Sequence, residues 1–140
     1  MPVTKSLHRI VVHLFLIDSF HRVLLLERSR TGHMDGFWAP PGGHVRLGER
    51  PSVAASRELE EETGVIARGL EPFAAMPFEL GVDLLFECFD WVGMPALQEP
   101  ESFRQLDWFD MHTPPVKAAP WVKTALDLRR DGTWYREFFA

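Results

Sequence analysis

Residues 43–65 read GHVRLGERPSVAASRELEEETGV, and this stretch joins a glycine-bearing loop to a segment with helical spacing. Pro51 suits the first turn of a helix, because the N–H that proline lacks would have no partner there. Gly64 suits the C-terminal stop, where a left-handed backbone is common. The sequence therefore predicts a loop followed by a helix over residues 51–63.

Acidic side chains share one face of this predicted helix. Glu58, Glu61 and Glu62 stand at i, i+3 and i+4, within an arc of about 100°, whereas Glu60 points nearly the opposite way. Three carboxylates on one face suit a hard divalent cation such as Mg²⁺, which prefers oxygen ligands and often shares its shell with substrate phosphates. The spacing alone leaves open a solvated helix face with i,i+4 ion pairs, in which Arg57 pairs with Glu61.

The wider stretch resembles the Nudix box, a family motif of fixed glycine, glutamate and arginine spacing. The matching residues are Gly43, Glu49, Arg57, Glu58, Leu59, Glu61, Glu62, Gly64 and Val65. The resemblance implies an α/β fold, a Nudix-type α/β/α sandwich with a central mixed sheet, in which the box forms a loop-helix-loop. The PPGG before the box and the order of predicted strands extend the likeness over most of the chain, and the length of 140 residues indicates a single domain over residues 1–140.

The resemblance further implies hydrolysis of the diphosphate linkage in a nucleoside diphosphate joined to another group, with Mg²⁺ as cofactor and Mn²⁺ as a substitute. It implies that a box glutamate, or one from a downstream loop, deprotonates the attacking water. Arg57 would orient a glutamate, and Glu49 would hold the box loop. The implied catalytic set is Glu61, Glu58 and Arg57, and the implied metal ligands are Glu58, Glu61, Glu62 and the backbone carbonyl of Gly42.

Four flanking residues are candidates for contact with the substrate. Arg28 ends a predicted strand where MutT-type relatives place a basic residue near the phosphates, although a surface arginine is the alternative. Trp38 could stack on a base or cover the core, and Gly43 offers bare backbone. Glu101 is the preferred candidate of the loop EPES (99–102), with Glu99 second.

The substrate subclass follows only by exclusion. Upstream and downstream signals fit the coenzyme A, dinucleoside polyphosphate and ADP-ribose types poorly, so a nucleoside triphosphate, including a damaged or modified one, is expected to give the monophosphate and pyrophosphate. ADP-ribose, nucleotide-sugar and coenzyme A substrates remain alternatives, as does a non-catalytic nucleotide-binding regulatory module. A prenyl diphosphate isomerase would need a cysteine upstream of the box, and the only cysteine, Cys88, lies downstream.

Composition sets wider limits. The chain has 140 residues, is 46% hydrophobic and carries a net charge of -5, which is typical of a globular protein and disfavours nucleic-acid binding. The N-terminal apolar run, flanked by Lys5 and Arg9, is too short to span a bilayer and does not have the form of a signal peptide. We therefore expect a cytoplasmic protein whose partner is a small nucleotide, without nucleic acid or membrane; monomer and homodimer both remain open.

The remaining pattern predicts strands before, between and after two helices. Residues 9–18 and 22–28 are expected to form two strands joined by a hairpin-like turn, and residues 29–45 a loop. Further strands are expected near 65–70, 73–80, 84–92 and 102–111. A closing helix over 118–132 should end near Gly132; within it Trp121 could approach a nucleotide or, as its helical spacing favours, pack in the core.

Overall fold

The computed structural model describes residues 7–139. Ala140 and residues 1–6, including the Lys5 considered for a leader peptide, lie outside the described part. Within residues 7–139, no helix has the combined length and apolar character needed to cross a bilayer.

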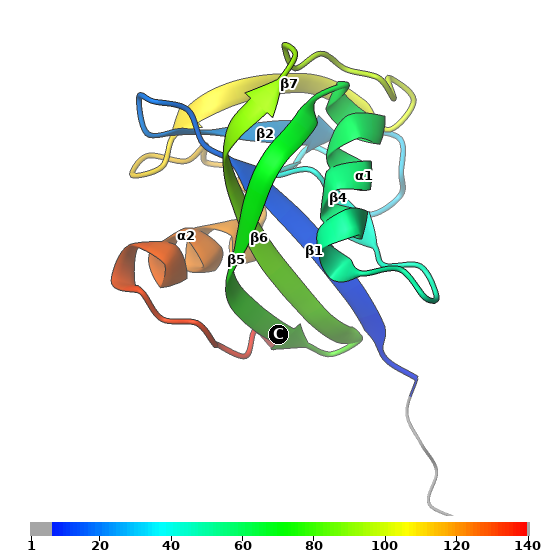
Figure 1. Ribbon diagram of the computed structural model, residues 1–140, viewed down its shortest axis with the longest axis vertical. Coiled ribbons are helices and arrows are strands. Elements are labelled where there is room, and N and C mark those ends of the chain that lie inside the picture. The colour runs from blue at the N-terminus through cyan, green and yellow to red at the C-terminus, as the bar shows by residue number, and fades with distance from the viewer. Residues whose placement is uncertain (1–6, 140) are drawn as a thin grey trace, which may run out of the picture.

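The described residues, 7–139, form seven strands and two helices, in the order β1 (Arg9–Leu16), β2 (Arg22–Arg28), β3 (Trp38–Ala39), β4 (Gly42–His44), α1 (Pro51–Thr63), β5 (Ile66–Phe78), β6 (Gly81–Val92), β7 (Phe103–Asp110) and α2 (Pro120–Asp131). A four-stranded sheet has the order β4-β1-β6-β5, and a three-stranded sheet has the order β3-β2-β7. Because β1 pairs with β6 in parallel and with β4 antiparallel, the larger sheet is mixed. The predicted α/β class with a mixed sheet is confirmed, and Figure 1 shows α1 and α2 on opposite sides of the strands.

Each helix covers its own hydrophobic core. Leu14 and Leu16 of β1 belong to the cluster that contains Leu59 of α1, whereas Phe15 belongs to the cluster that contains Val122 of α2. Successive side chains of a strand point to opposite faces, so a strand between two helices must be apolar on both. This explains why β1, apart from His13, and the centre of β2 are apolar on both faces.

The ends of both helices are those that the sequence predicts. Helix α1 runs from Pro51 to Thr63, and the N–H of Gly64, at φ 77°, donates to the carbonyl of Glu60. Helix α2 ends before Gly132, at φ 69°. Both glycines take the left-handed backbone that costs other residues more, which is why they stop the helices.

The predicted hairpin of residues 9–18 and 22–28 is wrong except for one residue pair next to the turn. One antiparallel bridge joins Ile17 to Val23, and then β1 and β2 separate into different sheets. The carboxylate of Asp18 accepts hydrogen bonds from the N–H groups of Phe20 and Arg22, which closes a tight turn. Along its length β1 pairs instead with β6 on one edge and β4 on the other, and both of its faces are covered by a core.

Two other boundaries differ from the prediction. The predicted loop over 29–45 contains β3 and β4, which are too short to produce a readable alternation of residue types. The predicted strands near 65–70 and 73–80 form one strand, β5, whose register with β6 shifts around Gly69 and Pro72. Glycine and proline therefore mark irregularities inside this strand rather than its ends.

Candidate active site

Helix α1 places its carboxylates against β4. Leu59 is fully buried in the core; the neighbouring Glu58 side chain is mostly shielded from solvent, and Glu62 is buried. A Cβ added to Gly43 would come within 2.5 Å of Oε1 of Glu58. Glycine at this position therefore leaves the space that the Glu58 carboxylate occupies.

Arg57 ties the box loop to two of the predicted ligands. Its Nε and Nη2 contact the two carboxylate oxygens of Glu49 at 2.8 and 3.0 Å, and Nη2 also donates to the carbonyl of His44. Its Nη1 lies 3.0 Å from Glu58 and 3.3 Å from Glu61. One rigid guanidinium thus fixes the loop and orients both glutamates, which is the geometry of the role predicted for it.

The carboxylate of Glu49, in the loop before α1, is strongly stabilised as an anion. Hydrogen bonds from Arg57, and then from the backbone N–H of Arg46, lower the pKa of Glu49 to about 2. In turn, the hydrogen bond with Glu49 raises the pKa of Arg57 further above its usual range. The pair therefore stays ionised throughout the neutral range.

Glu62 is the most buried of the acidic side chains, with only 3% of its surface exposed. Its pKa lies well above the ordinary value, first because of burial, then because of a hydrogen bond with Glu58 and the negative charges of Glu58 and Glu99. The backbone of Gly42 acts in the opposite direction. Burying negative charge beside other negative charge is costly unless a proton or a cation compensates it.

The loop after β6 brings a further carboxylate to this face. The N–H of Gln98 donates to the carbonyl of Glu62, so the loop is anchored at the end of α1. Burial, and then the charges of Glu101, Glu58 and Glu61, raise the pKa of Glu99. Glu99, the second candidate of the sequence, therefore faces the helix, while Glu101 is exposed and acts on Glu99.

The oxygen atoms of Glu58, Glu61, Glu62 and Gly42 are ligands of the type that a hard divalent cation prefers. In this conformation their side chains are not arranged around a common metal position. Among residues 7–139, no three acidic, histidine or cysteine side chains are close enough together to hold an ion in this conformation. Glu58 lies close enough to Glu62 to help raise its pKa, and Glu61 is paired with Arg57. A cation bound to these oxygens would compensate the negative charge that burial and the neighbouring carboxylates make costly.

Two of the residues predicted to contact the substrate, Arg28 and Trp38, make contacts that hold the fold together. Arg28 donates through Nε to the carbonyl of His33, so it holds the loop that follows β2. Trp38 is half-buried in the core on the α2 side, and its ring meets that of Phe109 edge-on at 4.9 Å. Within residues 7–139, neither has a hydrogen bond or ring contact with the acidic residues of α1.

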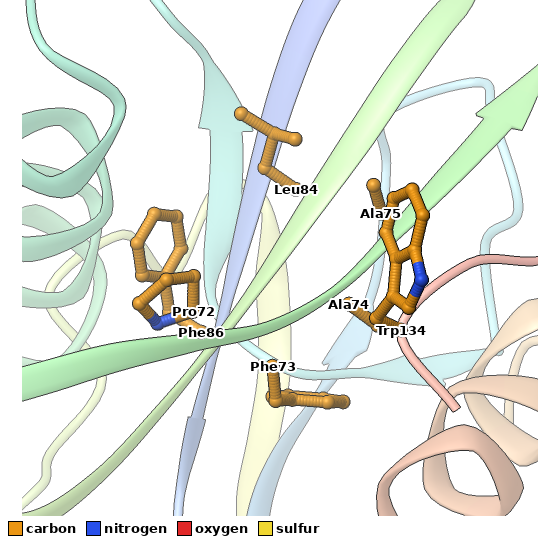
Figure 2. A pocket seen from close by; sticks show the side chains of 7 residues that line it. All are labelled: Pro72, Phe73, Ala74, Ala75, Leu84, Phe86 and Trp134. Carbon is orange, nitrogen blue, oxygen red and sulfur yellow. The ribbon is translucent and has the colours of Figure 1, made fainter. Parts of the chain in front are cut away.

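An apolar pocket lies elsewhere on the molecule. Figure 2 shows its lining, which comes from residues 72–75 of β5, from Leu84 and Phe86 of β6 and from Trp134. None of these side chains carries a charge, so the pocket offers nothing to a metal ion or a diphosphate.

A polar pair that the sequence does not reveal lies on the face of the larger sheet opposite α1. Nδ1 of His13 lies 2.8 and 2.9 Å from the two carboxylate oxygens of Asp83, and the His13 ring is 4.3 Å from that of Trp121. Burial raises the pKa of Asp83, and His13 partly offsets this. The available signal was a polar residue next to apolar ones in each strand, His13 in β1 and Asp83 in β6, but their pairing across 70 positions is not visible in the sequence.

Comparisons with known proteins agree with this geometry. A family model described as the NUDIX domain matches residues 7–129. The 8-oxo-dGTP diphosphatase of Haemophilus influenzae is 35% identical over 100 residues, which cover 68% of this chain and 71% of that protein. The m7GpppN-mRNA hydrolase NUDT17 of Xenopus laevis is 48% identical over 52 residues, which cover 36% of this chain and only 18% of that protein.

The fold also matches a solved structure. The crystal structure of a MutT NUDIX hydrolase from Burkholderia pseudomallei superimposes with a TM-score of 0.79 at 26% sequence identity, covering 85% of this chain and 95% of that one.

Proposed function

Because this chain belongs to the NUDIX domain family, we propose that it is a pyrophosphohydrolase that cleaves the diphosphate linkage of a nucleoside diphosphate joined to another group. The proposed substrate is a nucleoside triphosphate, ordinary or oxidatively damaged, and the proposed products are the nucleoside monophosphate and pyrophosphate. The observation that carries the proposal is the Arg57 network, which holds Glu58 and Glu61 beside the buried Glu62.

Glu58, Glu61, Glu62 and the backbone carbonyl of Gly42 would hold Mg²⁺, for which Mn²⁺ can substitute. When bound, the metal supplies an activated water and neutralises charge that develops on the phosphoryl group. Glu61 is the exposed member of the set, so its carboxylate is the one that an incoming substrate and water can reach. We assign it, with Glu58 as the alternative, to accept the proton of the attacking water, and Arg57 to position both.

The triphosphate is favoured over other substrates by the match to the Haemophilus influenzae 8-oxo-dGTP diphosphatase, which covers 71% of that relative. The intact set of box glutamates argues against a binding module without hydrolysis. Cys88 is buried, burial raises the pKa of its thiol, and it lies on β6, which argues against an isomerase with a cysteine acid or base.

A substrate panel with phosphorus NMR tests this proposal. The purified protein is incubated with Mg²⁺ and, separately, with ordinary triphosphates, 8-oxo-dGTP, ADP-ribose, a nucleotide sugar and coenzyme A. We expect the largest kcat/KM for a triphosphate, with pyrophosphate rather than orthophosphate as the inorganic product. Orthophosphate with a nucleoside diphosphate would reject the cleavage site, and a preference for another compound of the panel would reject the substrate.

We also infer that residues 1–140 act as one domain on small nucleotides in the cytoplasm. The family match over 7–129 and the single free, buried cysteine support this inference. Fractionation of cells that express the full chain tests it: enrichment with membranes or outside the cytoplasm would contradict it.

A further inference from the structure

Two consecutive glycines bring the acidic face of α1 close to the opposite side of the sheet. Gly43 gives its space to Glu58, whereas a Cβ on Gly42 would come within 2.5 Å of Cδ2 of His13. Strand β4, which holds both glycines, is at the edge of the four-stranded sheet. A ligand whose phosphates lie at Glu58 therefore has only the bare backbone of one edge strand between it and His13.

His13 is held in one orientation by a buried carboxylate. Both oxygens of Asp83, which is only 8% exposed, lie within hydrogen-bonding distance of Nδ1 of His13. Because a carboxylate accepts, Nδ1 carries the proton, and in the corresponding tautomer of the imidazole Nε2 is an acceptor.

The second ring nitrogen of His13 has no protein partner. Within residues 7–139, no hydrogen bond reaches Nε2, and no buried side-chain nitrogen or oxygen is left unsatisfied. Since His13 is not an exposed residue, its Nε2 must itself be in contact with solvent. A polar pair that served only the core would turn its hydrogen-bonding groups inward, whereas this one presents a free acceptor.

An aromatic ring completes the arrangement. Trp121, at the start of α2, lies 4.3 Å from the His13 ring at an interplanar angle of 46°, and meets Phe15 edge-on at 6.5 Å. The tryptophan is only half-buried, so part of its ring remains accessible. An oriented acceptor next to an aromatic surface suits a nucleoside, which combines a flat ring with N–H and hydroxyl donors.

We propose that His13, positioned by Asp83, determines specificity by accepting through Nε2 a hydrogen bond from an N–H or hydroxyl group at the nucleoside end of the substrate. This proposal rests on the proposed function, because that function places the diphosphate of the substrate at α1. The group that donates to Nε2 is either an N–H of the base or a hydroxyl of the ribose.

Calorimetric binding of mononucleotides to the full chain tests this without requiring hydrolysis. The probes are GMP, dGMP, IMP, AMP and 8-oxo-dGMP, and the variants are His13→Ala, Asp83→Asn and, as the matched control, His112→Ala on an exposed turn. We expect His13→Ala to weaken the tightest mononucleotide by about 5- to 30-fold, as the loss of one hydrogen bond predicts. His112→Ala should bind like the wild type.

The Asp83→Asn variant separates positioning from mere packing. The asparagine amide can donate to Nδ1, which would turn Nε2 from acceptor into donor with little change of shape. We expect the order of affinities among the mononucleotides to change, while a purely structural role would weaken all of them alike. A difference between GMP and IMP assigns the donor to the base amine, and a difference between GMP and dGMP assigns it to the ribose hydroxyl.

A second measurement needs no variant. In wild-type protein labelled with ¹⁵N in its histidines, the Nε2 resonance of His13 should shift when the tightest mononucleotide is added. An unshifted resonance, unchanged affinities in His13→Ala, or wild-type protein that binds no mononucleotide would each overturn the proposal. Triphosphate hydrolysis with none of the His13 effects would reject this proposal alone, and His13-dependent binding without hydrolysis would reject only the proposed function.

Discussion

At the scale of single residues, Arg57 connects the parts of the candidate site. It contacts Glu49 of the loop and Glu58 and Glu61 of the helix, so the positions of two proposed ligands depend on one side chain. The helical period predicted which glutamates share a face, because that relation is local. It could not predict that Glu62 would be buried or that Glu99 would join it, since both depend on loops that pack against α1.

Neutralising single carboxylates of α1 tests their assignment. We expect Glu61→Gln to lower kcat by at least ~100-fold, or ~2.7 kcal/mol of transition-state stabilisation, because the amide is a poor ligand and no base. Glu60→Gln is the matched control one residue away, on an exposed position, and should retain nearly full activity. Steady-state kinetics on both variants decide the matter: equal losses would mean that the acidic face has been assigned wrongly.

The pH dependence of stability tests the contact between Glu49 and Arg57. The folded-state pKa of Glu49 is lowered from 4.5 to about 2, so the stability that it contributes is present above pH 4.5 and is lost as the pH falls through about 2. Glu49→Gln should therefore lower Tm at pH 7, and its difference from the wild type should shrink between pH 4.5 and 2. Thermal melts across this range measure it; a difference that does not vary with pH would count against the ion pair.

At the scale of elements, the sequence predicts those that carry their own signals. Helix α1 begins at Pro51 and ends before Gly64 as expected, because proline and glycine act locally on the backbone. Strands β3 and β4 carry no such signal, since two or three residues show no period. Their pairing is decided by distant partners: Glu27 faces Trp38, and His13 faces Gly42.

Trp38 of β3 links that strand to its neighbours. Its ring packs against Phe109 of β7, and its backbone N–H and carbonyl bond to Lys117 and Ala119. We expect Trp38→Ala to cost about 2–3 kcal/mol of unfolding free energy, somewhat less than a fully buried aromatic because the ring is half-buried. Chemical denaturation measures this cost.

The alternative role of Trp38 predicts a different result from the same variant. If the ring stacked on a base, Trp38→Ala would leave Tm nearly unchanged and would raise KM for some nucleotides more than for others. The packing that the structure describes predicts the reverse: a lower Tm and an unaltered order of substrate preference.

At the scale of the whole molecule, the fold class could be predicted and the arrangement of its strands could not. Apolar runs such as residues 9–18 indicate strands that are covered on both faces, and the box resemblance supplies the architecture. The separation of β1 and β2 into two sheets, and the meeting of His13 with Asp83, depend on contacts between distant segments. No local pattern in the sequence contains that information.

We propose that the acidic face of α1, together with the loops packed on it, forms a divalent-metal hydrolytic centre. The most direct test is the rate of nucleoside triphosphate hydrolysis by the wild-type chain, first in excess chelator and then after Mg²⁺ or Mn²⁺ is restored. We predict that turnover disappears with the chelator and returns with either metal, because Glu58, Glu61 and Glu62 then regain the cation that compensates their charge. Undiminished turnover in excess chelator would contradict this account.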